Sequence, residues 1–481
     1  MRNGKEKRFV LDVVDRNSEA ISLLGDNIFY FAELGMQEFE TSRLMIRILE
    51  EAGFRIERNI SGMPTAFMAT YGSGHPVIAF HTEFDATPAS SQMPGVPEPR
   101  PVIEGAPGHT EGHNVNAAVM IGAAYAVKKA MDEFGLQGTL KVFGAPAEEQ
   151  LVSRPYFVRD GYFKDVDVAL HDHIGKELGT VYGLRQYALI SAEFTFRGES
   201  AHAATAPWNA RDALDAAVLM DIGFDKLREH LEPTHRSHRV ITDGGDQPNV
   251  IPNHAKIWWF FREPTAEKTR VLFEKAKRIA EGAAIMTGTT YAVNVLSAAW
   301  PTRANRVMAE VIQKNIEMVG MPIWTEKEQR LVSEVQAKVN VKPTGMPEKV
   351  SKLKEAEQSV SANDSGEVTW VVPTGLINFP SNIPGVSYHH WSAGVSLVTS
   401  IAHKGAVAGA KAMAASAMDL LMDPKLVDKA KETFKEEIGD IEYRPLLPPE
   451  QQPPLELNQQ IMERYRPLME QHYLREKPEF K

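Results

Sequence analysis

The amino-acid sequence predicts an α/β fold, with a mostly parallel sheet that carries helices on both faces and a smaller α+β domain inserted into it. Short apolar runs alternate with helical segments in the first part of the chain, as they do when crossover helices join parallel strands. This alternation of predicted strands and helices changes near residue 188. In addition, 481 residues are too many for one simple core. We therefore assign residues 1–187 and 300–430 to the larger domain, 188–299 to the inserted domain and 431–481 to a C-terminal extension.

The elements of the larger domain can be placed in chain order. Residues 18–53 are expected to be helical, because apolar side chains recur at spacings of three and four and Gly53 provides a stop. A later helix, capped by Asn114, should run to about Phe134 after a proline- and glycine-rich loop at residues 90–107. Buried strands are predicted from the apolar runs at residues 77–80, 139–144 and 167–170.

The inserted domain is predicted to have the order strand–helix–strand–helix–strand. Its segments are residues 190–196, 209–230, 250–261, 265–286 and 291–296. Beyond it, residues 331–357 are charged and contain prolines, so we expect a surface excursion there, whereas residues 368–421 return to core-like sequence. The tail after Pro445 is rich in Pro, Glu and Gln and is expected to form an extended arm.

The composition excludes several classes of function. A formal charge of −10 makes the chain a poor candidate for non-specific binding to nucleic acid or anionic lipid. There is no cysteine, so any transition metal must be held by His, Asp, Glu or water. No secretory apolar run follows the charged N-terminus, and no stretch reaches the roughly 18 apolar residues of a membrane span. We therefore expect a cytoplasmic protein with no nucleic-acid or membrane partner.

Four groups of carboxylates and imidazoles stand at the ends of predicted elements. They are Glu111-Gly112-His113-Asn114, Glu148-Glu149, His171-Asp172-His173 and Tyr388-His389-His390. The carboxyl ends of parallel strands meet at one edge of a sheet, so these groups should lie close together. Jointly they offer enough ligands for two metal ions about 3.5–4 Å apart.

Two cations at that distance repel each other and need a bridging carboxylate, a task that suits Glu111. In the adjacent pair, one glutamate can ligate while the other acts as a general base. Each group alone has an ordinary interpretation. A Glu-Glu pair is usually a solvated surface patch, and His171 with His173 could be a strand end with one buried and one exposed ring. Only the four groups together support the prediction of a metal site.

Several longer motifs then resemble the metallo-aminoacylase and carboxypeptidase family, in particular its amidohydrolase branch. They are Asn59–Phe67, Ser200–Ala204, Pro248–Pro252, Gly366–Trp370 and Ser400–Gly405, and the likeness covers nearly the whole chain. The resemblance implies a two-metal amidohydrolase whose inserted domain is a lid and dimerisation domain. It implies Glu111 as the bridge, His113 and His173 on one metal, and Glu149 and His389 on the other.

The resemblance also implies roles for residues that hold substrate. Glu148 matches the general base, and His202 matches a histidine that polarises the scissile carbonyl, usually across a dimer interface. Asn249 and Arg262 match residues that bind the substrate's carboxylate, and a guanidinium can grip a carboxylate with two hydrogen bonds. An ordinary salt bridge beside Pro264 is the alternative for Arg262.

Two departures from the family pattern bear on the metal. Glu111 stands where the amidohydrolase branch has cysteine, which favours an oxygen-loving ion such as Mn²⁺ over Zn²⁺, although Zn²⁺ stays compatible. His81 occupies a place where other branches of the family carry a ligand histidine but the amidohydrolase branch does not, and Asp85 would orient a ligand. Whether His81 or His390 ligates metal stays open on the sequence.

The expected activity is therefore hydrolysis of an amide in an acyl- or aroyl-amino acid, such as an aminobenzoyl-glutamate. The partners expected are a small-molecule substrate with a carboxylate, and either a second copy of the chain or a related chain as the other half of a dimer. Two alternatives stay open. The same site could remove ammonia hydrolytically from an activated aminoaromatic compound, or the chain could be a non-catalytic partner of such a hydrolase.

Overall fold

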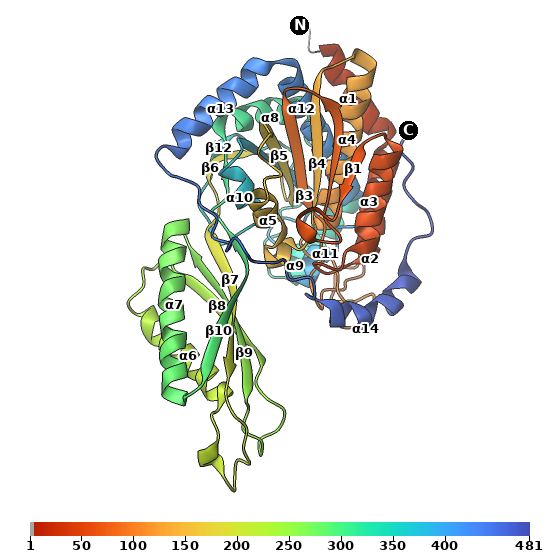
Figure 1. Ribbon diagram of the computed structural model, residues 1–481. Helices are drawn as coiled ribbons and strands as arrows, with labels where there is room; N and C mark the ends of the chain where they lie inside the picture. Colours follow the sequence, from red (N-terminus) through yellow and green to blue (C-terminus); the bar gives the residue numbers. More distant parts are fainter. Residues whose placement is uncertain (1–3) are drawn as a thin grey trace.

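The computed structural model describes residues 4–481, which form a larger body and a smaller, elongated one (Figure 1). The larger body is built on a six-stranded sheet with the order β1-β2-β4-β3-β5-β13. Its strands are β1 Arg55–Arg58, β2 Phe67–Ser73, β3 Val77–Glu83, β4 Gly138–Ala145, β5 Val168–Gly175 and β13 Thr374–Pro380. β3, β4, β5 and β13 run parallel, while β1 and β2 are antiparallel additions at one edge. The expected mostly parallel sheet is confirmed.

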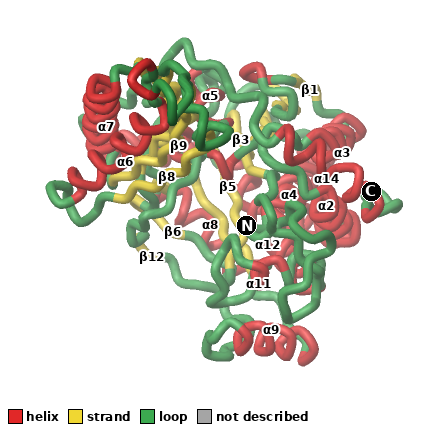
Figure 2. Tube along the Cα trace, turned by 90° about the horizontal axis from the view of Figure 1, so that it is seen from below, coloured by secondary structure: helices red, strands yellow, loops and turns green. Residues whose placement is uncertain are grey.

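Helices cover both faces of this sheet. One face packs against α1 Gly4–Arg16, α2 Ser18–Phe31, α3 Phe39–Glu51, α4 His113–Phe134, α8 Arg306–Val319, α12 Ser400–Met422 and α13 Pro424–Ile438. The other face meets the short helices α5 Ser153–Arg159 and α10 Gly366–Thr369. Alternate side chains of β3 enter different cores: Ile78 and Phe80 join the first, and Ala79 joins the second. From below, α2, α3 and α4 lie on one side of β3 and β5, and α6 and α7 on the other (Figure 2).

The smaller body is an antiparallel sheet of order β10-β7-β9-β8 with two helices on one face (Figure 1). Its elements are β7 Ala188–Arg197, α6 Ala213–Arg228, β8 Arg236–Asp243, β9 His254–Glu263, α7 Ala266–Thr287 and β10 Thr290–Ala299. On β9, Trp259 and Phe261 are fully buried and contact Phe224 of α6. The sequence prediction missed β8, because this edge strand is almost wholly exposed and has no apolar alternation.

The structure corrects one local prediction and adds helices to two segments for which none was expected. The long helix begins at His113 after Gly112 in a left-handed conformation, so Asn114 is not its cap. The segment expected to be a surface excursion contains most of α9 Glu326–Lys338, which a capping box between Thr325 and Glu328 starts. The C-terminal arm contains α14 Gln459–Met469, which packs on the larger body through Met462 and Met469.

Smaller elements complete the chain. The short strands are β6 Val181–Leu184, β11 Arg303–Ala304 and β12 Lys354–Glu355, and one further helical turn is α11 Trp391–Gly394. Turns of 3-10 helix occur at Ile60–Gly62, Glu148–Gln150, Pro207–Asn209 and Glu470–His472. Within residues 4–481, none of the helices combines the length and apolar character needed to cross a bilayer.

Candidate metal centre

The carboxyl ends of β3, β4, β5 and β13 bring the predicted groups to one edge of the sheet. β3 and β5 pair in parallel with His81 opposite His171, so Glu83 and His173 follow two residues later and lie on the same face. A 3-10 turn directly after β4 carries Glu148 and Glu149. This geometry explains why side chains far apart in sequence can share one centre.

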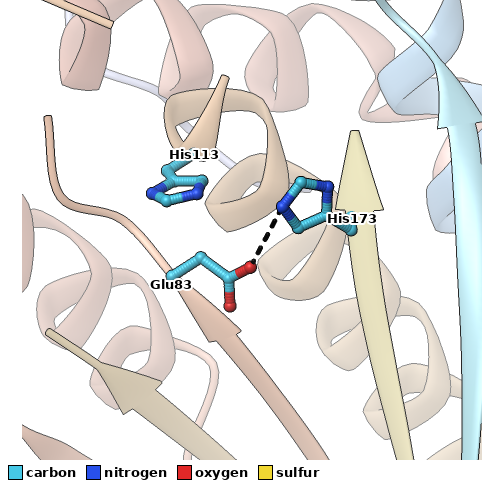
Figure 3. A group of neighbouring side chains, drawn as sticks. All are labelled: Glu83, His113 and His173. Carbon is cyan, nitrogen blue, oxygen red and sulfur yellow. Dashed lines mark ion pairs between the residues drawn. The ribbon is translucent and has the colours of Figure 1, made fainter. Parts of the chain in front are cut away.

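A first group of possible ligands contains Glu83, His113 and His173 (Figure 3). The Nε2 atom of His173 lies 3.6 Å from Oε1 of Glu83. The Nδ1 atom of His113 lies 3.1 Å from Oδ1 of Asp85, an interaction that fixes the ring and aims Nε2 at the centre. Asp85 also accepts a hydrogen bond from the backbone of Glu149 at 3.0 Å, so it orients two neighbours of the centre.

A second group contains Glu111, Glu149 and His389. The Nε2 atom of His389 is 2.6 Å from Oε2 of Glu111 and 3.1 Å from Oε2 of Glu149. The other oxygen of Glu111, Oε1, lies 3.7 Å from Nε2 of His173, which belongs to the first group. One carboxylate therefore stands between the two groups and presents one oxygen to each.

The two groups have the chemistry of a cation site. Nε2 of His113 and Oε1 of Glu149 are buried and have no hydrogen-bond partner in the described part of the chain. Unpaired buried polar atoms are costly, and a cation would satisfy both. The donors are imidazole nitrogens and carboxylate oxygens, a set that suits Zn²⁺ as well as harder ions such as Mn²⁺.

The charges of the second group are strongly coupled. Burial opposes ionisation of Glu111, but the hydrogen bond from His389 and the nearby imidazoles lower the pKa of Glu111 to about 2. Hydrogen bonds to Glu111 and Glu149 raise the pKa of His389 to about 10. Burial and the charge of Glu111 raise the pKa of Glu149 to about 7. A cation binds only deprotonated ligands, so its binding at this group would release protons from His389 and Glu149.

Glu148 is buried beside the centre, with Oε2 3.7 Å from Nε2 of His113. Burial raises the pKa of Glu148 well above its usual range, and the charges of Glu83 and Glu149 add to the increase. A carboxyl with a raised pKa is a stronger proton acceptor, which is what a general base needs.

Glu83 was not singled out from the sequence, although it stands between His81 and Asp85. Its carboxylate forms a fully buried ion pair with Arg154, whose guanidinium also pairs with Asp364. Burial alone would raise the pKa of Glu83, but Arg154 and His171 hold it well below its usual range, so Glu83 stays ionised. The parallel register of β3 and β5 places Glu83 beside His173, and the sequence carries little information on that register.

A third group of possible ligands in residues 4–481 contains His113, Glu148 and Glu149. His81 and His390, whose roles the sequence left open, lie outside all three groups. His81 stacks on His171 with ring centroids 4.9 Å apart and planes at 8°. His171 and His173 are both buried, which excludes the alternative of a strand end with one exposed ring. The Nδ1 atom of His390 lies 2.8 Å from the hydroxyl of Ser392.

His202 and Asn249 lie in the inserted domain, outside the larger body that carries the ligand groups. The backbone of His202 forms an isolated antiparallel β-bridge with Val250. The Nδ1 atom of His202 accepts a hydrogen bond from the backbone N–H of Ala204 at 3.1 Å. Asn249 is exposed and accepts a hydrogen bond from Gln247 at 2.6 Å. Neither His202 nor Asn249 lines the cavity at the candidate centre. Within one chain, the structure therefore does not bring these two residues to the ligand groups.

A cavity of about 330 Å³ opens over the centre. Glu111, Glu148, Glu149, His173 and His389 contribute to its wall. The rest of the wall comes from the strand ends and the inserted domain and includes Arg185, Phe260, Arg262, Asn378 and Tyr388. Of the residues predicted to hold the substrate's carboxylate, Arg262 therefore lines the cavity, whereas Asn249 does not.

The comparisons with known proteins agree with this geometry. Residues 184–285 match the M20 peptidase dimerisation domain. The chain is 33% identical over 457 residues to one of the two polypeptides of p-aminobenzoyl-glutamate hydrolase from Escherichia coli, a match that covers 89% of this chain and 95% of that protein. The chain belongs to the M20 family of metallopeptidases. The resemblance inferred from the motifs is thus confirmed.

Other M20 relatives extend over most of the chain. Xaa-Arg dipeptidase of Mus musculus is 27% identical over 445 residues, covering 89% of this chain and 92% of that protein. The fold matches an aminobenzoyl-glutamate utilization protein from Klebsiella pneumoniae with a TM-score of 0.61, at 17% identity, over 85% of this chain and 97% of that one. It also matches a dinuclear metal-binding M20 peptidase from Bacillus subtilis, with a TM-score of 0.54 at 18% identity over 85% and 99% of the two chains. As an M20 protein, this chain is a metal-dependent hydrolase of amide bonds.

Proposed function

We propose that this M20 hydrolase uses two divalent cations to cleave the amide bond of an acyl- or aroyl-amino acid. The observation that carries the proposal is the position of Glu111, whose two carboxylate oxygens face different ligand groups. A carboxylate in that position can bridge two cations and offset their repulsion. The name of the Escherichia coli relative makes an aminobenzoyl-glutamate the first substrate to test.

In this proposal, His113 and His173 would hold one cation, with Glu83 in the same ligand group. Glu149 and His389 would hold the other, and Glu111 would be shared by both groups. The carboxylate of Glu111 is a harder donor than the cysteine thiolate of the amidohydrolase branch, which favours Mn²⁺, and Zn²⁺ is the alternative. Cations bound here would supply Lewis acidity, which polarises a carbonyl group and lowers the pKa of water.

The remaining chemistry belongs to the protein's own side chains. Glu148 takes a proton from the attacking water and delivers it to the leaving nitrogen. Arg262 binds the substrate carboxylate in the cavity. His202 and Asn249 complete the site of a partner molecule, where His202 donates a hydrogen bond to the developing oxyanion. Their absence from the cavity wall of their own chain supports this assignment.

The assembly proposed is a dimer formed through the inserted domain, either with a second copy or with a related chain. The match to a dimerisation domain supports it, as does the similarity of this chain to two differently named polypeptides of the Escherichia coli hydrolase. Val240 and Ile241 on the edge strand β8 are exposed apolar residues, and such strands can pair with another chain.

The test is metal analysis of the purified chain after incubation with Mn²⁺ or Zn²⁺, combined with a screen of acyl- and aroyl-amino acids and of aminoaromatic compounds. We expect two ions per chain and release of the free amino acid from an aroyl-amino acid. Release of ammonia from an aminoaromatic compound, with every amide left intact, would replace amide cleavage by deamination. Less than one ion per chain and no turnover would contradict the two-metal site.

A further inference from the structure

Arg185 is a cavity residue to which neither the sequence motifs nor the proposed mechanism gives a role. It lies one residue beyond β6, in the segment that leads from the larger body to β7 of the inserted domain. Its side chain lines the same cavity as the ligand carboxylates and Arg262. The cavity therefore contains two guanidinium groups, one from each body of the molecule.

The guanidinium of Arg185 makes no ion pair with any residue from 4 to 481. Burial lowers the pKa of Arg185, and Tyr388 and Glu83 oppose that shift only through space. The carboxylate of Glu83 is already paired with Arg154. The side chain is partly buried and borders the cavity, so its guanidinium is available to an anion bound there.

The backbone holds Arg185 in a fixed position. Its N–H group donates to the carbonyl oxygen of Thr302 at 2.9 Å, and its carbonyl oxygen accepts from the backbone of Ser359 at 2.7 Å. The next side chain, Gln186, is held by Thr302 at 2.8 Å and by Ser361 at 3.0 Å. The anchored backbone fixes the point from which the Arg185 side chain reaches the cavity.

The charge balance of the cavity decides what kind of ligand fits. Two divalent cations bound here would engage the carboxylates of Glu83, Glu111 and Glu149, which belong to the ligand groups. Arg185 and Arg262 would then remain without anionic partners on the chain. Since a guanidinium binds a carboxylate with paired hydrogen bonds, two of them favour a ligand with two carboxylates.

We propose that Arg185 is a specificity residue that binds the second carboxylate of the substrate, so that the enzyme prefers acyl derivatives of an acidic amino acid. Arg262 then takes the α-carboxylate, and Arg185 takes the side-chain carboxylate. This inference rests on the proposed function, and it adds the residue that separates acidic from neutral amino acids. A related neutral substrate, with an amide in place of the side-chain carboxylate, leaves Arg185 unpaired.

The experiment measures binding separately from turnover. The Glu148→Gln protein, loaded with Mn²⁺, is titrated calorimetrically with N-(4-aminobenzoyl)-L-glutamate and with the corresponding L-glutamine compound. The glutamate compound should bind about 10- to 100-fold more tightly, the range expected for one hydrogen-bonded charge pair. Adding Arg185→Gln should reduce this preference to about twofold or less.

Two matched variants serve as controls. Arg197→Gln changes an exposed arginine at the end of β7 and should leave the preference intact. Arg262→Gln should weaken both compounds by similar factors, because both share the α-carboxylate. The inference is overturned if the parent protein binds the two compounds equally or not at all, or if Arg185→Gln weakens both equally. The preference for the glutamate compound can depend on Arg185 even if the wild-type protein cleaves neither compound. In that case the proposed amide substrate is contradicted, and the role of Arg185 in binding the second carboxylate is retained.

Discussion

The carboxylate of Glu111 and the carboxyl of Glu148 lie in the same centre but have opposite environments. Glu111 is surrounded by imidazoles, and its pKa is lowered to about 2. Glu148 is buried among other carboxylates, and its pKa is raised well above the usual range. Environments that move the pKa values of two carboxylates in opposite directions suit them to different tasks, Glu111 as a ligand and Glu148 as a proton carrier.

The first prediction concerns Glu148. Glu148→Gln should lower kcat by about 100- to 10,000-fold, the usual contribution of a general base, and should leave the metal content unchanged. The measurements are steady-state kinetics and elemental analysis of the same preparation. Glu51→Gln, an exposed change at the end of α3, is the control and should behave like the wild type. A kcat above about one tenth of the wild-type value would remove Glu148 from the base role.

A second prediction at this scale concerns Glu367, a buried carboxyl away from the centre. Burial raises its pKa to about 8 from an ordinary 4.5. Because its folded-state pKa is raised, its contribution to stability is fully present below pH 4.5 and is lost as pH rises towards 8. Glu367→Gln should therefore match the wild type near pH 4.5 and be more stable by about 4–5 kcal/mol at pH 8.5, because each unit of the pKa shift is worth roughly 1.4 kcal/mol.

Urea unfolding of both proteins across this pH range checks the prediction for Glu367. A stability difference that does not change with pH would mean that Glu367 has an ordinary pKa in the folded protein.

Sequence patterns identified most of the centre because they marked strand ends. Glu111 and Glu148 each follow a predicted strand or precede a predicted helix. Glu83 could not be identified in the same way, because its position depends on the register between two strands that are 85 residues apart, Glu83 ending β3 and Val168 starting β5. Register is fixed by three-dimensional packing and has only a weak local signal.

At the scale of elements, the start of α4 matters most, because Glu111 and His113 flank Gly112. Gly112 has a φ of 101°, and a Cβ atom there would lie 2.4 Å from Cδ1 of Ile174. This glycine is therefore needed both for its conformation and for space. The same helix ends at Gly135, which has a φ of 61° and no heavy atom within 4 Å of an added Cβ.

The third prediction uses this pair. Gly135→Ala should cost about 1 kcal/mol, from left-handed backbone strain alone. Gly112→Ala should cost about 2–4 kcal/mol, because a steric clash is added to the strain. It should also weaken metal binding, since the helix start must shift. Urea unfolding and metal titration of both variants provide the comparison, and equal costs would show that the contact with Ile174 is absorbed without consequence.

Elements with a buried apolar pattern were predicted well, and those without one were not. β3 and β4 are wholly buried and appeared as apolar runs. β8 exposes nearly every residue, so its existence depends on pairing with β9 and is not visible in its own sequence. In α9, the high charge concealed Val332 and Val335, two buried residues at helical spacing.

At the scale of the whole molecule, the proposed catalytic groups are divided between two bodies. The ligand groups and Glu148 belong to the larger body, whereas His202 and Asn249 lie in the inserted domain, away from the cavity. A dimer in which each inserted domain serves the partner's centre would unite them.

The fourth prediction tests this arrangement by mixing two inactive variants. His202→Ala and Glu148→Gln, dissociated and reassociated together, should regain up to about a quarter of the wild-type activity. About half of randomly formed dimers contain both variants, and each of these has one intact site. Activity is compared with that of each variant alone and with sedimentation data on the mixture. If heterodimers form and stay inactive, His202 acts within its own chain.

The span between Glu111 and His389 also affects how the protein matures. These two side chains touch at 2.6 Å although 278 residues separate them in sequence. During synthesis, the ribosome releases His389 long after Glu111, so the second ligand group cannot form until most of the chain has emerged. In the two-cation site proposed above, cation loading would therefore follow synthesis of most of the chain, and it would link two segments that are far apart in sequence. Because a ligand that binds only the folded state stabilises it, the stability of the protein should then rise with the free metal concentration.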